Sequence, residues 1–148
     1  MQYHVPPAKL FACNLPANLL LGRVAKALQN AARAKDAEFE KRFLELAAEI
    51  ESAFFMEEAW MEIRGLPTLK SQREQHARVL QGMHYAYAAL MQGQTASSRK
   101  VVTSLLPLWL PAHFASMRQA LGQRKIHNVL AHVTAPRRDA SGSRRFRQ

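Results

Sequence analysis

Four polar side chains stand on helical faces that are otherwise apolar. Glu57 continues a stripe whose members follow one another at steps of four and three residues: Phe39, Phe43, Leu46, Ile50 and Ala53. Gln72 and His76 are four residues apart, so they share one face of a helix. His113 follows an apolar residue, Trp109, at the same interval. A carboxylate, an amide and two imidazoles are therefore predicted to meet in a core, where an unpaired charge costs several kcal/mol.

Two groups could balance the charge of Glu57. The first is a metal ion held by Glu57, His76 and His113, because two imidazoles and one carboxylate suit iron or zinc. The second is Arg118, which lies five residues after His113 on the flank of the same helical face. Its guanidinium could hold the carboxylate with two hydrogen bonds. The sequence therefore poses a choice between a metal site and a buried ion pair of Glu57 with Arg118.

Helical periodicity runs through most of the chain, and strand signals are nearly absent. Apolar stripes separated by glycine, proline and charged residues predict four helices, at about residues 16–32, 37–64, 67–91 and 99–122. Gly65 is expected just after the second helix, and residues 92–98 are expected to form a loop. Pro107 and Pro111 should bend the fourth helix, whose stripe includes Leu105. Four helices with short connections predict an all-α, up-down-up-down four-helix bundle.

Length and composition predict one domain with short additions at both ends. The 148 residues are 48% apolar, which is enough for one sizeable core. We expect an N-terminal arm at residues 1–16, the bundle at 17–123, and a short helix with a basic, disordered tail at 124–148. Between Arg124 and Gln148 there are seven basic residues and one acidic residue, so this end contributes +6 of the net charge of +10.

Cysteine content and the distribution of apolar residues indicate a cellular compartment. The single cysteine, Cys13, excludes an internal disulfide and a cysteine-based metal cage, which fits a reducing environment. The sequence has neither the pattern of a secretion signal nor an uninterrupted apolar stretch long enough to cross a bilayer. We therefore expect a cytoplasmic protein that does not associate with membranes.

The residues around the polar positions resemble the hemerythrin and bacteriohemerythrin family of di-iron four-helix bundles. That family carries a histidine on its first helix, then HxxxE, HxxxH and HxxxxD on the following three. The matching flanks are Phe54, Glu57, Glu58 and Met61 around the second motif, Leu66-Pro67 before the third, and Trp109-Leu110 before the fourth. The resemblance covers about residues 18–121, and it implies the same four-helix fold.

Most of the ligand positions of that family hold other residues in this chain. The replaced positions are Asn18, Ala53, Gln72 and Arg118. Glu57, His76 and His113 remain, and the resemblance implies that they lie on the side of one iron. A dinuclear centre is therefore not expected, and the resemblance leaves room for at most one iron or zinc ion.

Arg118 favours a metal-free protein, because a guanidinium cannot ligate a cation and would attract Glu57. The chain also lacks a phosphate-binding glycine loop and a nucleophile elbow. We therefore expect no cofactor and no enzymatic activity, and we predict a binding, interaction or sensory module with an unidentified protein or small-molecule partner. The alternative is a mononuclear iron or zinc protein that binds metal or oxygen through Glu57, His76 and His113. A third hypothesis is nucleic-acid or acidic-partner binding through the basic tail.

Overall fold

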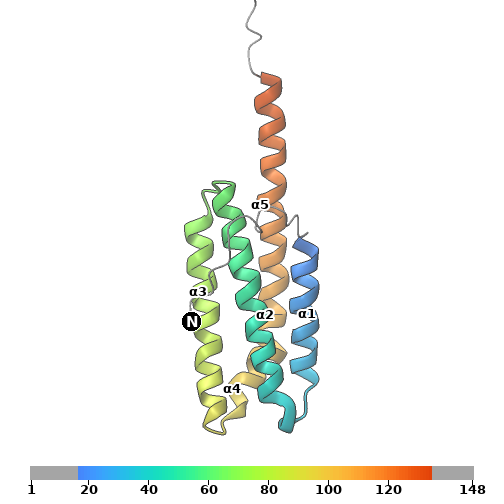
Figure 1. The fold of residues 1–148 in the computed structure, drawn as a ribbon, viewed down its shortest axis with the longest axis vertical. Helices are drawn as coiled ribbons and strands as arrows, with labels where there is room; N and C mark the ends of the chain where they lie inside the picture. The colour runs from blue at the N-terminus through green and yellow to red at the C-terminus, as the bar shows by residue number, and fades with distance from the viewer. Residues whose placement is uncertain (1–16, 135–148) are drawn as a thin grey trace, which may run out of the picture. The chain divides into compact units, whose positions relative to one another are not determined.

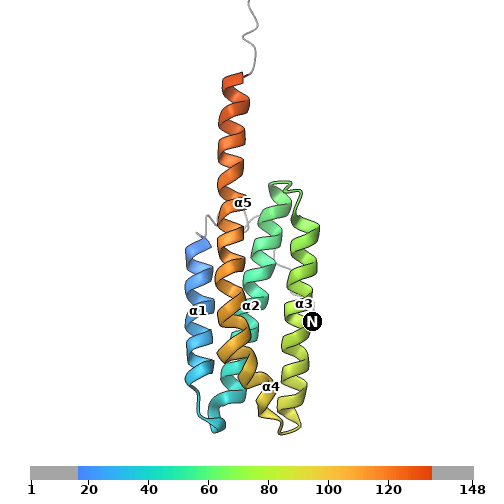
Figure 2. The same cartoon turned by 180° about the vertical axis from the view of Figure 1, so that it is seen from behind.

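The chain folds as an all-α bundle, as predicted. A computed structural model describes the backbone of residues 17–134 and the side chains of residues 21–120. The described elements are α1 (Ala17–Arg33), α2 (Asp36–Ile63), α3 (Leu69–Met91), α4 (Thr95–Lys100), the π-helical turn η2 (Val101–Leu105) and α5 (Leu106–Thr134) (Figures 1 and 2). None of the described helices is long and apolar enough to cross a membrane.

The chain divides into two compact units, Met1–Phe114 and Ala115–Gln148. Within the first unit, α2 packs against both α1 and α3, and η2 contacts α1. The predicted N-terminal arm and the tail after Thr134 lie outside the described residues, so nucleic-acid binding through that tail stays a prediction. The short helix expected near residue 126 is the end of α5, which continues without a break to Thr134.

Helix α2 supplies the centre of the core through the stripe that its sequence predicts. All five apolar members of the stripe are almost fully buried: Phe39, Phe43, Leu46, Ile50 and Ala53. They pack with Val24 and Ala31 of α1, with Met83 and Ala86 of α3, and with Leu106 and Leu110 of α5. Because fully burying one such side chain contributes about 1.5–3 kcal/mol, this stripe holds the helices in the register that defines the site.

Two glycines follow the ends of α2 and α3. Gly65 has a φ of 57°, its N–H donates to the Glu62 carbonyl at 2.9 Å, and the Leu66 N–H donates to the Met61 carbonyl at 3.0 Å. Gly93 has a φ of 80° and stands in the same double hydrogen-bond arrangement after α3. A left-handed residue at this position favours glycine, since it lacks a Cβ. The prediction that Gly65 follows the end of the second helix is confirmed.

The segment before α5 differs from its prediction in two respects. The expected loop at residues 92–98 is shorter, because α4 already begins at Thr95. Leu105, which the spacing places on the buried stripe, is 50% exposed, and Leu106 is buried in its place. The cause is the π-helical turn, which has more residues per turn than an α-helix and delays the stripe by one position. Pro107 follows directly and lacks the N–H that would bond the Thr103 carbonyl in a regular α-helix.

Candidate metal centre

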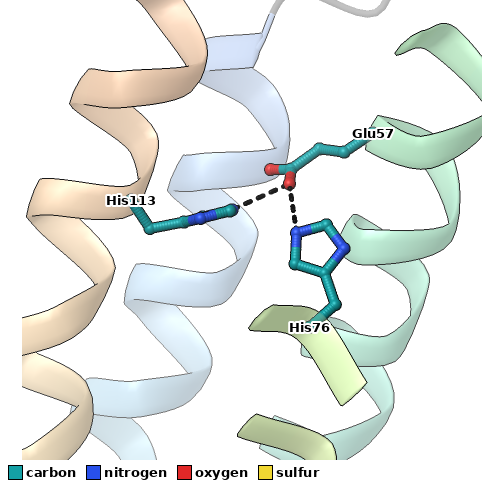
Figure 3. Close-up of side chains that lie close together, drawn as sticks. All are labelled: Glu57, His76 and His113. Carbon is teal, nitrogen blue, oxygen red and sulfur yellow. Dashed lines mark hydrogen bonds and ion pairs between the residues drawn. The ribbon is translucent and has the colours of Figure 1, made fainter. Parts of the chain in front are cut away.

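Three buried polar side chains from three helices meet in the first unit (Figure 3). Glu57 comes from α2, His76 from α3 and His113 from α5, and their residues are 8%, 1% and 5% exposed. Each stands where an apolar stripe faces the core, which is why burial follows from the fold. The structure thus brings together all three residues that the sequence analysis named as a remnant metal site.

One carboxylate oxygen faces both imidazoles. Glu57 Oε2 lies 2.9 Å from His113 Nε2 and 3.3 Å from His76 Nε2. The donor atoms of the three residues all lie within 4.8 Å of one another. The contact with His113 is a hydrogen bond, whereas the contact with His76 Nε2 is not, and that nitrogen has no hydrogen-bond partner in the described part of the chain.

The contact of the other ring nitrogen, Nδ1, determines whether His76 Nε2 carries a hydrogen. His76 Nδ1 lies 2.8 Å from Glu58 Oε1, and a carboxylate can only accept, so Nδ1 carries the hydrogen. In a neutral imidazole Nε2 is then a bare lone pair, and it faces the carboxylate of Glu57. Two electron-rich atoms at this separation repel each other unless a positive charge lies beside them. A second proton on His76 or a bound cation could supply it.

Unpaired polar atoms are concentrated around this group. Among the described side chains, three buried nitrogen or oxygen atoms lack a hydrogen-bond partner: Gln72 Oε1, His76 Nε2 and His113 Nδ1. Two of them belong to the cluster itself, and Gln72 lies one helical turn before His76 on the same face of α3. Leaving a buried polar atom unpaired costs about 1–3 kcal/mol. A polar or charged group that paired these atoms would remove that cost.

Aromatic rings hold both imidazoles in position. Phe54 stacks on His76 with ring centroids 3.9 Å apart and planes 6° from parallel. Trp109 stacks on His113 at 4.4 Å and 13°. Phe114 adds an edge contact to His113 at 5.4 Å. These apolar walls fix the ring planes, so the nitrogen lone pairs keep their directions without a ligand.

Glu57 is ionised at neutral pH. Burial works to raise its pKa, but the close contacts with the His113 and His76 rings, together with the charges of these rings, outweigh burial and lower the pKa below the usual value of 4.5. An ionised carboxylate is a donor of electron pairs only. The group therefore presents one oxygen of Glu57 and the free Nε2 of His76, and His113 Nε2 joins them as a cation ligand once it gives up the hydrogen that it donates to Glu57.

The three donors are compatible with a single metal ion. At metal–ligand distances of about 2.0–2.2 Å, neighbouring donors stand about 3.0 Å apart in an octahedral site and about 3.4 Å apart in a tetrahedral one. The separations of 2.9 and 3.3 Å at Glu57 Oε2 fall at these values. Two imidazoles and one carboxylate are ligands that zinc and iron both accept.

The replaced family positions lie in different environments. Ala53 and Gln72 are buried, at 1% and 8% exposure, and the side chain of Asn18 lies outside the described residues. Arg118 belongs to the second unit, and its side chain is exposed. The predicted ion pair of Glu57 with Arg118 would join residues of the two units and stays a prediction. Within the first unit the carboxylate of Glu57 is met by two imidazoles.

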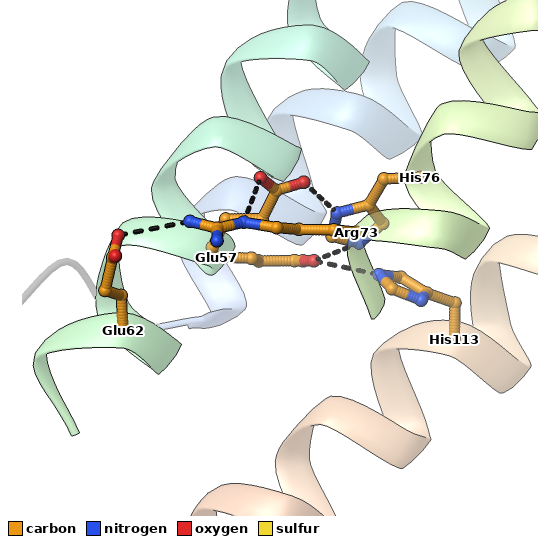
Figure 4. A network of polar contacts seen from close by, with 6 residues as sticks. Glu57, Glu62, Arg73, His76 and His113 are labelled. Carbon is orange, nitrogen blue, oxygen red and sulfur yellow. Dashed lines mark hydrogen bonds and ion pairs between the residues drawn. The ribbon is translucent and has the colours of Figure 1, made fainter. Parts of the chain in front are cut away.

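Sequence reasoning missed a set of charged residues beside the cluster (Figure 4). Glu58 contacts His76, and Arg73 joins Glu58 Oε2 at 3.3 Å to Glu62 Oε2 at 3.1 Å. In the sequence Glu58 stands out only as part of a family signature, because it falls about 100° around the helix from Glu57 and so off the predicted stripe. The sequence signal that could have identified Glu58 is its position next to Glu57, on a helix that packs against the one carrying His76.

Comparison of the chain with protein-family models, with curated proteins and with solved structures finds no match in any of the three. The resemblance to hemerythrins therefore rests on the residues quoted above and stays a prediction.

Proposed function

We propose that this protein binds one divalent transition-metal ion, zinc or iron, through Glu57, His76 and His113. The observation that carries the proposal is the bare Nε2 of His76, which faces the carboxylate of Glu57 at 3.3 Å without a hydrogen bond. A metal ion would turn this repulsive contact into two metal–ligand bonds. The resemblance to a metal-binding family supports the same interpretation of the three residues.

A second proton on His76 is the competing explanation. A proton on Nε2 lies in the ring plane along one direction, and the contact with Glu57 is not a hydrogen bond. A metal ion need not lie on the line between two atoms, because it takes a position from which all three donors can be reached. The lack of a hydrogen bond at Nε2 therefore supports a metal ion rather than a proton.

Three protein donors would leave at least one coordination position free, as in metal sites that accept water or a small ligand. A bound ion would supply a Lewis-acidic position in a largely apolar setting. The chain's own residues would hold that position: Phe54 and Trp109 orient the rings, and Glu57 balances charge. Binding of a small ligand such as oxygen, rather than an enzymatic reaction, is the role that this arrangement supports.

Metal content and metal uptake test the proposal. The full chain is purified without an affinity tag, analysed by plasma mass spectrometry, then stripped and titrated with Zn²⁺ and, without oxygen, with Fe²⁺. We expect about one ion per chain, and no uptake by the His76→Ala, His113→Ala double variant, since two of three ligands are gone. His84→Ala is the matched control, because His84 is an exposed histidine of α3 that contacts only Glu51 among the described residues.

An absence of metal uptake by the wild-type chain would overturn the proposal. So would equal uptake by the double variant. Either result would return the metal-free interaction module as the favoured function.

A further inference from the structure

We propose that Glu58 is a positioning residue, which fixes the hydrogen of His76 on Nδ1 and so keeps Nε2 free to bind metal. The inference rests on the proposed metal site. It assigns a role to a side chain that would not itself touch the ion. Arg73, drawn in Figure 4, donates to the other carboxylate oxygen of Glu58.

Two consecutive carboxylates of α2 contact opposite nitrogens of the same ring. Glu57 Oε2 lies 3.3 Å from His76 Nε2, and Glu58 Oε1 lies 2.8 Å from Nδ1. Consecutive helical residues point about 100° apart, so the two carboxylates reach the ring from different sides. His76 is 1% exposed and stacked on Phe54, which leaves the ring little freedom to escape this arrangement.

The Glu58 contact decides which nitrogen of His76 is available. Because an ionised carboxylate only accepts, it stabilises the tautomer with hydrogen on Nδ1 and a lone pair on Nε2. Without Glu58 the hydrogen would move to Nε2, beside Glu57. A metal ion would then have to displace it. The negative charge of Glu58 also makes the imidazole a stronger ligand.

Arg73 helps to hold Glu58 in place, but we expect it to affect metal binding less than Glu58 does. Its Nε lies 3.3 Å from Glu58 Oε2, and its Nη2 lies 3.1 Å from Glu62 Oε2. The side chains of Arg73 and Glu62 are 47% and 65% exposed, compared with 26% for Glu58. Exposed ion pairs contribute little. The effect on metal binding should therefore be concentrated in Glu58 and nearly absent at Glu62.

Zinc affinity, measured by competition with a chelating dye, tests the assignment in three variants of the full chain. Glu58→Leu should weaken zinc binding by about 10–100-fold, the usual effect of removing a partner of a ligating histidine. Glu58→Gln should weaken it less, since the amide oxygen still accepts from Nδ1. Glu62→Gln is the matched control and should change affinity at most a few-fold, although it removes the same charge from the same arginine.

Nitrogen NMR of the metal-free chain gives a readout that a merely structural role would not move. In the neutral ring, measured at about pH 8, the wild type should have the His76 hydrogen on Nδ1 and Glu58→Leu should have it on Nε2. An unchanged tautomer, or unchanged zinc affinity in Glu58→Leu beside a binding wild type, would overturn the inference. A wild type that binds no zinc would sink the metal site, while the tautomer result would still decide the role of Glu58.

Discussion

Two charged clusters of this bundle differ in how completely their atoms are paired. One surrounds Arg99, at the turn from α1 to α2. Its Nη1 donates to the Ala34 carbonyl at 2.8 Å, its Nη2 donates to Asp36 Oδ1 at 2.7 Å, and the guanidinium lies 3.8 Å from the centre of the Phe39 ring. Cation, anion, carbonyl and aromatic face all have partners within the cluster.

The Glu57 cluster is built from similar groups but is left open. It holds a buried carboxylate and two imidazoles, and two of its buried nitrogens lack partners among the described residues. The Arg99 cluster is explained by folding alone, because its contacts close the connection between two helices. The Glu57 cluster is not, since packing would favour apolar side chains there. Incomplete pairing in a buried cluster is thus the sign that separates a site from a structural contact.

The largest expected effect is the stabilisation of the folded protein by zinc, which should depend on the Glu57 cluster and not on the Arg99 cluster. Zinc at about 100–1,000 times its dissociation constant should stabilise the wild type by about 2.7–4.1 kcal/mol, because it binds the folded chain only. Urea unfolding with and without zinc measures this. The stabilisation should persist in Arg99→Met and vanish in Glu57→Gln. A zinc effect of equal size in Glu57→Gln would mean that the ion binds elsewhere.

The next effect concerns the Arg99 cluster itself. Arg99→Met removes a cation with two charge-assisted hydrogen bonds and its contact with Phe39, so the free energy of unfolding should fall by about 1.5–3 kcal/mol. Urea unfolding of the metal-free chain measures the loss. Arg42→Met is a suitable comparison, because Arg42 pairs only with nearby Glu45 on the helix surface and should change little. Equal losses of unfolding free energy in the two variants would mean that the Arg99 cluster stabilises the fold no more than the surface pair of Arg42 with Glu45.

The smallest effect is a pH dependence of the metal-free protein. The pKa of Glu57 is lowered in the folded chain, so its contribution to stability is present above the usual value of 4.5 and is lost as pH falls through the lower folded value. Wild type and Glu57→Gln should therefore converge in unfolding free energy as pH drops below about 4.5. The two curves are compared by urea unfolding between neutral and acidic pH. Parallel curves across this range would contradict the lowered pKa.

The sequence predicted the parts of the fold that depend on periodicity and on backbone geometry. The buried stripe of α2 and the glycine at its end follow from spacing and from the conformational freedom of Gly65. The exposure of Leu105 could not be deduced from spacing, since the extra residue of the π-helical turn leaves no mark in the apolar pattern.

The sequence predicted the three candidate ligands but not the groups that face the charge of Glu57. Glu57, His76 and His113 lie on stripes, so their meeting follows from helix packing. The resemblance to hemerythrins places Arg118 at a ligand position and so predicts that it points inward, but side-chain direction depends on local packing, and in the second unit this side chain is exposed. Glu58 was missed because contacts off a stripe depend on how two helices are rotated against each other.

The π-helical turn at Val101–Leu105 ties the geometry of the site to the number of residues in this segment. The turn accommodates one residue more than an α-helical turn, so the extra residue does not rotate the part of α5 that carries His113. A further inserted residue that no second π-helical turn absorbed would rotate His113 by about 100° away from Glu57. No ligand would be altered by such an insertion, yet the three donors would no longer meet.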